Sequence, residues 1–73
     1  MKKLTVNTWM EREMFGYLFF AVYAISADEW YIIGKADTYE EAKEKLTAEM
    51  ADAEEGDKGE WFVINFEGEK VEG

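Results

Sequence analysis

The sequence predicts a small α+β fold: a mostly antiparallel sheet of three to five strands with one amphipathic helix packed on one face. Two observations predict this fold class. Residues 17–25, 30–36 and 60–66 are rich in β-branched and aromatic residues and are bounded by turn-like residues, as strands are. Residues 39–55 instead repeat apolar side chains at helical spacing. The 73 residues form one domain, 1–73, and are too few for a second.

Residues 3–10 (KLTVNTWM) alternate loosely between apolar and polar side chains, which predicts a short first strand. The polar residues 11–13 then connect this strand to the next. Gly16 predicts a β-bulge where the second strand begins. The predicted order of elements along the chain is therefore β-β-β-α-β.

The second predicted strand, 17–25, is apolar on both faces. Alternate side chains on a strand point to opposite faces, so Phe19 and Tyr23 share one face and Phe20 and Val22 share the other. Both faces need cover, but a single helix with a narrow apolar stripe covers only one.

Three covers for the second face stay open at this point. The N-terminal segment, with Trp9, Met10 and Met14, could fold across it, or the sheet could curl strongly. The third cover is another chain, either a second copy or a target, because large exposed apolar patches usually mark interaction sites.

The strand over 30–36 returns from the turn-like residues SADE at 26–29. Gly34 predicts a bulge or the close approach of a bulky neighbour. A helix that links 30–36 to 60–66 makes those two strands parallel, so 17–25 is expected between them, antiparallel to both. Residues 70–72 are expected to add a short edge.

The helix over 39–55 begins with a capping box, in which Thr38 is the N-cap and Glu41 follows three residues later. The residues of its apolar stripe are Tyr39, Ala42, Leu46, Met50 and Ala53. Gly56 and Gly59 close the segment.

The composition argues against catalysis. The chain has no histidine or cysteine and only one arginine and one serine, so a Ser-His-Asp or Cys-His site cannot form. The same absence removes zinc ligands, and residues 55–60 lack the order of a calcium loop, so we expect no metal and no cofactor. A small carboxylate hydrolase stays as a rival, but it needs a deep cleft that a domain of this size seldom encloses.

The charge is strongly negative and unevenly placed. The net charge is −9, and residues 37–60 carry −7 of it, from ten acidic and three basic residues. Such a field repels nucleic acid and anionic membranes and attracts basic surfaces. The longest uncharged run, 14–27, is too short to span a membrane, and the lack of cysteine fits a reducing compartment, so we expect a cytoplasmic protein.

At 100° per residue, the outward half of the helix carries a row of acidic residues. The row consists of Glu40, Glu41, Glu44, Asp52 and Glu55, and Asp57 extends it. One interpretation is a solvated face that keeps an aromatic-rich protein in solution. The other is imitation of a polyanion, because residues 38–55 carry −5 over roughly 27 Å, or one charge per roughly 5.4 Å. A single nucleic-acid strand carries one per about 3.4 Å and duplex DNA one per about 1.7 Å, so the spacing permits imitation of one backbone only.

In size, charge, lack of cysteine and aromatic-rich α+β layout, the whole chain resembles the small acidic phage proteins that inhibit host defence nucleases, of the anti-CRISPR and anti-restriction type. The resemblance rests on no motif and carries over no residues. It implies an inhibitor that acts in the host cytoplasm and occludes a basic nucleic-acid groove on its target.

The leading hypothesis is therefore a non-enzymatic binding protein whose acidic helix face docks on a basic, nucleic-acid-binding surface of a partner, without binding nucleic acid or membrane itself. The alternative is a homodimeric assembly module that uses the aromatic sheet face, with the acids only solubilising it. The candidate dimer or partner face consists of Trp9, Tyr17, Phe19, Tyr23 and Trp30.

Overall fold

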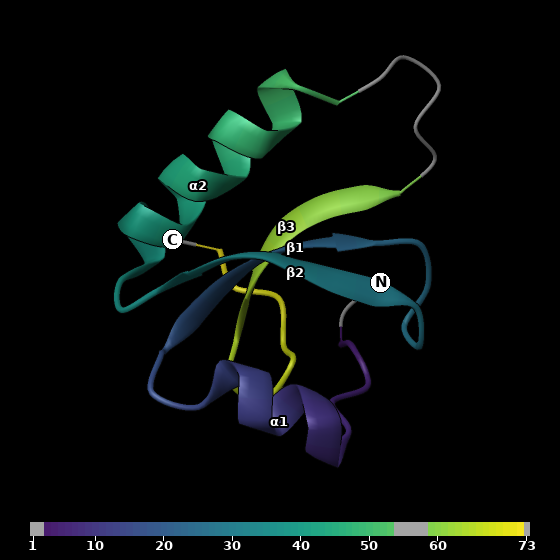
Figure 1. Ribbon diagram of the computed structural model, residues 1–73. Coiled ribbons are helices and arrows are strands. Elements are labelled where there is room, and N and C mark those ends of the chain that lie inside the picture. Colours follow the sequence, from purple (N-terminus) through teal and green to yellow (C-terminus); the bar gives the residue numbers. More distant parts are fainter. Residues whose placement is uncertain (1–2, 54–58, 73) are drawn as a thin grey trace.

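Two helices enclose a three-stranded sheet in the computed structural model, which describes residues 3–53 and 59–72. The elements are α1 (Thr8–Met14), β1 (Phe19–Ala24), β2 (Trp30–Ala36), α2 (Tyr39–Ala51) and β3 (Glu60–Asn65). The strand order is β2-β1-β3 and both pairings are antiparallel, which confirms the α+β class and the central place of β1. Figure 1 shows α1 and α2 on opposite sides of the sheet.

The predicted first strand over 3–10 is wrong, and so are the order β-β-β-α-β and the single helix. Residues 3–7 take part in only one isolated bridge, between Lys3 and Glu69. The chain turns helical at Thr8 because the Asn7 side chain caps the helix and accepts a hydrogen bond from the Met10 N–H at 2.9 Å. Gly16, with φ of +93°, lies in the turn that follows α1 and is not a β-bulge.

The N-terminal segment and α1 cover the face of β1 that carries Phe20 and Val22. Phe20, Val22 and Ala24 belong to a buried cluster that includes Leu4 and Met14. The other members of this cluster are Trp30, Phe62 and Ile64. The Trp30 indole Nε1–H donates to the Thr5 carbonyl oxygen at 2.9 Å and so joins β2 to the N-terminal segment. Of the three covers left open by the sequence, the cover by the N-terminal segment is present.

The opposite face of β1 is covered by α2. Ala21 lies in a second buried cluster with Ala42 and Leu46 of the helix. The Thr38 hydroxyl accepts from the Glu41 N–H at 3.2 Å, which confirms the predicted cap. The helix nevertheless ends at Ala51 rather than near residue 55, and Met50 is 47% exposed. Only the N-terminal half of the predicted apolar stripe is therefore buried against the sheet.

Gly34 lies at an irregularity in β2. The register with β1 shifts between Ala21, which pairs with Gly34, and Val22, which pairs with Ile32. A Cβ atom at Gly34 would come within 2.9 Å of the Lys45 Cβ on α2. Both predictions for this glycine, a bulge and a close neighbour, are confirmed, and α2 packs close to β2 at this point.

A turn after β3 connects the C-terminal residues to the N-terminal segment. The Asn65 side-chain oxygen accepts from the N–H groups of Glu67 and Glu69 at 2.9 and 3.0 Å. Gly68 has φ of +85°, and its carbonyl oxygen accepts from the Leu4 N–H at 2.8 Å. The edge expected over 70–72 is reduced to a bridge between Lys70 and Ile64.

If α1 is an essential cover, Met14→Ala will destabilise the protein strongly. Met14 is completely buried, and a cavity of this kind costs about 2–5 kcal/mol in the free energy of unfolding. Met50→Ala is the matched control, because Met50 is half exposed and its loss should cost about 0.5 kcal/mol or less. Urea unfolding followed by tryptophan fluorescence measures both; equal losses would contradict the packing described.

Candidate functional site

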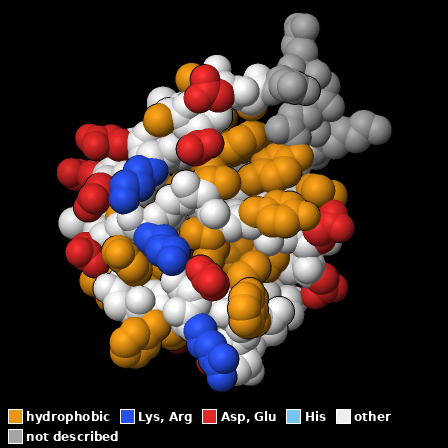
Figure 2. Space-filling model, in the orientation of Figure 1, with side chains coloured by type: hydrophobic (Ala, Val, Ile, Leu, Met, Phe, Trp, Pro, Cys, Tyr) orange, Lys and Arg blue, Asp and Glu red, His pale blue; other side chains and the backbone are white. Residues whose placement is uncertain are grey.

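The outward face of α2 carries the acidic residues that the helical spacing predicted. Glu40, Glu41 and Glu44 are exposed on the helix, and Asp52, also exposed, follows at its C-cap. Figure 2 shows acidic side chains gathered along α2. The predicted row members Glu55 and Asp57 lie outside the described residues. We call the four described residues Glu40, Glu41, Glu44 and Asp52 the acidic face.

The two lysines of α2 offset half of the charge of its four acidic residues, but only Lys45 forms a salt bridge with the acidic face. Lys45 Nζ lies 3.8 Å from Glu41 Oε1 and also donates to the Lys35 carbonyl oxygen on β2. Lys43 Nζ lies 5.8 Å from the centroid of the Tyr39 ring. Across residues 3–53 and 59–72, no salt bridge involves Glu40, Glu44 or Asp52. Three carboxylates of the acidic face are therefore available to a cation from outside.

The charge along the helix is sparser than the sequence suggested. The 13 residues of α2 span about 20 Å and hold four acids and two lysines, which leaves one net charge per about 10 Å. A single nucleic-acid strand carries one per about 3.4 Å. The predicted density was higher because it covered residues 38–55, which add three acids to those of α2. These are Asp52 at the C-cap and residues 54 and 55, which lie outside the described residues. By itself, α2 can imitate only part of one phosphate backbone.

The five residues of the candidate dimer or partner face do not form one surface. Trp30 is only 4% exposed and lies in the cluster under α1, whereas Trp9 is exposed on α1. Phe19 packs on the other side of the sheet, with its ring centroid 6.4 Å from that of Tyr39. Tyr23 contacts Trp61 on that same side, with centroids 4.8 Å apart, and Tyr17 precedes β1. Trp9 was expected on a strand but lies on α1, and Trp30 pairs with Ala24 and therefore faces away from Phe19 and Tyr23.

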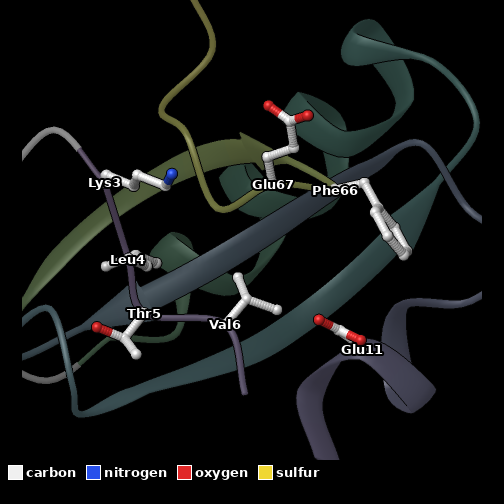
Figure 3. Close-up of a pocket in the computed structure, with 7 residues that line it drawn as sticks. All are labelled: Lys3, Leu4, Thr5, Val6, Glu11, Phe66 and Glu67. Atoms are coloured by element: carbon white, nitrogen blue, oxygen red, sulfur yellow. The ribbon is translucent and has the colours of Figure 1, made fainter. Parts of the chain in front are cut away.

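The structure has a surface hollow that the sequence did not predict (Figure 3). It measures about 660 Å³ and lies between the N-terminal segment, α1 and the turn after β3. Its lining residues are Lys3, Leu4, Thr5, Val6, Glu11, Phe66 and Glu67. A smaller hollow of about 400 Å³ shares Glu11 and Phe66 with it. These residues come from both ends of the chain, so only the tertiary structure brings them together, and none was a predicted site residue.

Few other features in the described part of the chain suggest a site. Among residues 3–53 and 59–72, no group of three acidic, histidine or cysteine residues could hold a metal ion. Neither helix in those ranges has the length and apolar character needed to cross a membrane.

One carboxylate next to the hollow has a perturbed acidity. Hydrogen bonds with the side chains of Glu67 and Asn65 hold the pKa of Glu69 below its usual value of 4.5. The Asn65 amide Nδ2–H donates to Glu69 Oε1 at 3.4 Å.

Comparison with protein-family models, with curated proteins and with solved structures found no match.

We expect Glu69→Gln to change how stability depends on pH. A carboxylate whose pKa is lowered in the folded state stabilises it above the unfolded pKa, and this contribution is lost as pH falls through the lowered value. The stability of the unmodified protein relative to Glu69→Gln should therefore decrease below about pH 4.5. Unfolding curves at pH 7, 5, 4 and 3 measure the difference; a constant difference would contradict the assignment.

Proposed function

We propose that this protein is a non-enzymatic binding protein that docks the acidic face of α2 on a basic surface of a partner protein. The observation that carries the proposal is that most carboxylates of the acidic face are exposed and unpaired within the described residues. Glu40, Glu44 and Asp52 are exposed and form no salt bridge within the described residues, while Lys43 and Lys45 lie against the protein's own groups. Exposed carboxylates without a salt bridge attract a positively charged surface and increase the rate of association with it.

The partner that fits this chemistry is a protein whose basic surface normally holds nucleic acid. Such surfaces carry lysine and arginine side chains spaced to meet phosphates. One net charge per about 10 Å on α2 supports occupation of part of such a groove, not replacement of a whole strand. The protein would then act as a partial nucleic-acid mimic and an inhibitor of the anti-CRISPR type, in the cytoplasm of the host cell. It would not bind nucleic acid itself, because its net charge of −9 has the wrong sign.

The structure does not favour the alternative of a homodimer joined through the aromatic sheet face. That alternative was attractive because β1 needed a second cover. Leu4 and Met14 now supply that cover from within the chain, and Trp30 is enclosed by them.

The proposal predicts that binding depends on the acidic face and on ionic strength. The test variant is the triple change E40Q/E44Q/D52N, and the matched control is E11Q/D28N/E72Q, which removes the same charge from exposed residues elsewhere. Three exposed charge pairs at about 0.5 kcal/mol each correspond to about a ten-fold change in Kd. We therefore expect the test variant to bind about ten-fold more weakly and the control to bind within two- to three-fold of the unmodified protein.

The partner for this measurement comes from a pull-down with the tagged protein in a host-cell extract at low salt. The Kd of the captured protein is then measured at 50 and 500 mM salt, where screening differs strongly. If the test and control variants lose affinity equally, binding depends on the net charge of the protein and not on the acidic face, and the proposal is contradicted. If the Kd is the same at 50 and 500 mM salt, the acidic face does not contribute to binding and only keeps the protein in solution.

A further inference from the structure

Three aromatic residues form a row across all three strands on the α2 side of the sheet. Tyr23 on β1 is the direct partner of Tyr31 on β2 and of Trp61 on β3. Directly opposed residues in an antiparallel pair share a face. Trp61 packs against the cluster that contains Ala42 of α2, which places the row on that face. We call Tyr31, Tyr23 and Trp61 the aromatic row.

The aromatic row is held in place but not covered completely. Tyr23 is fixed between Trp61 and the backbone of Gly59, where a Cβ atom would collide with the Tyr23 ring. Tyr31 is 55% exposed at the edge of the sheet, and Trp61 is partly exposed. Figure 2 shows hydrophobic side chains gathered over the sheet beside α2, with acidic side chains on both sides of the patch. An aromatic surface therefore lies between groups of acidic side chains.

Three lysines in the described part of the chain lie over rings outside the aromatic row. Lys35 lies over Tyr17, Lys43 over Tyr39 and Lys70 over Phe62, each 5.8 Å from the ring centroid. Within residues 3–53 and 59–72, no lysine or arginine lies over Tyr31 or Trp61. The single arginine, Arg12, is on α1 on the far side of the sheet.

We propose that the aromatic row is the binding site for an arginine side chain on the basic surface of the partner. This rests on the proposed function and names the partner residue that it requires. The guanidinium group is planar, weakly hydrated and stacks on aromatic faces, whereas the lysine ammonium is a compact and strongly hydrated charge. The acidic surroundings favour a cationic residue over a purely apolar one. Specificity for arginine then comes from the row, and the acidic face supplies the general attraction.

The test compares two synthetic peptides of equal charge, hexa-arginine and hexa-lysine, by two-dimensional NMR of the ¹⁵N-labelled protein. Both peptides should bind to the acidic protein, but hexa-arginine should bind at least about three-fold more tightly. It should also shift the indole N–H signal of Trp61 and the backbone signals of Tyr31 and Tyr23. Equal affinity for the two peptides, or shifts confined to α2, would overturn the proposal.

Variants of Tyr31 separate stacking from simple apolar contact. Tyr31→Phe keeps the ring and should retain the preference for arginine, whereas Tyr31→Leu should reduce it to below about 1.5-fold. Phe15→Leu is the matched control, because Phe15 is 81% exposed on the α1 side. An arginine preference that survives Tyr31→Leu, or one lost equally in Phe15→Leu, would overturn the proposal.

The proposal can fail separately from the proposed function. If E40Q/E44Q/D52N weakens binding of both peptides while Tyr31→Leu changes nothing, the acidic face stands and the arginine site is refuted. If Tyr31→Leu abolishes the arginine preference while E40Q/E44Q/D52N leaves the affinity for both peptides unchanged, the arginine site stands and the role of the acidic face is refuted.

Discussion

The packing of residues 3–14 against β1 is the interaction on which the rest of the structure depends. Leu4 and Met14 are almost completely buried, and they cover the side of β1 that carries Phe20 and Val22. Burial of one such side chain contributes about 1.5–3 kcal/mol, a large share of the 5–15 kcal/mol that stabilises a typical domain. A chain of 73 residues buries little surface, so it depends heavily on each of these contacts.

This cover decides which surfaces remain for a partner. With α1 and α2 on opposite sides of the sheet, each face of β1 packs against residues of the same chain. The outward side of α2 is then free to carry carboxylates. Helix α2 packs on the sheet through Ala42 and Leu46, and Tyr31 of the aromatic row remains 55% exposed. The acidic face and the aromatic row therefore lie on the same side of the molecule, where one partner can contact both.

Local patterns predicted the three strands and the start of α2. The return of strand 30–36 from the turn at 26–29 and the Thr38 cap are decided by neighbouring residues, and the structure agrees with both. Helix α1 was missed because its seven residues are too few to show a clear period, although the spacing of Met10 and Met14 and the Asn7 cap were available signals. The end of α2 was predicted too late because good helix formers continue beyond Ala51 without the contacts to the sheet that stabilise a helix.

The candidate site was predictable only in part, for a similar reason. The outward position of Glu40 and Glu44 follows from helical geometry alone. The aromatic row requires the register of three strands, including the irregularity at Gly34 that brings Tyr31 opposite Tyr23. The hollow lined by Lys3 and Phe66 requires the two ends of the chain to meet. Sequence patterns do not specify either of these long-range arrangements.

The most direct test of this account is amide hydrogen exchange of β1 measured over a dilution series. If residues 3–14 supply the cover, the N–H groups of Phe20, Ala21 and Val22 should be among the slowest to exchange, and their protection should not depend on concentration. Protection that falls on dilution would mean that a second chain covers β1, and would contradict the account.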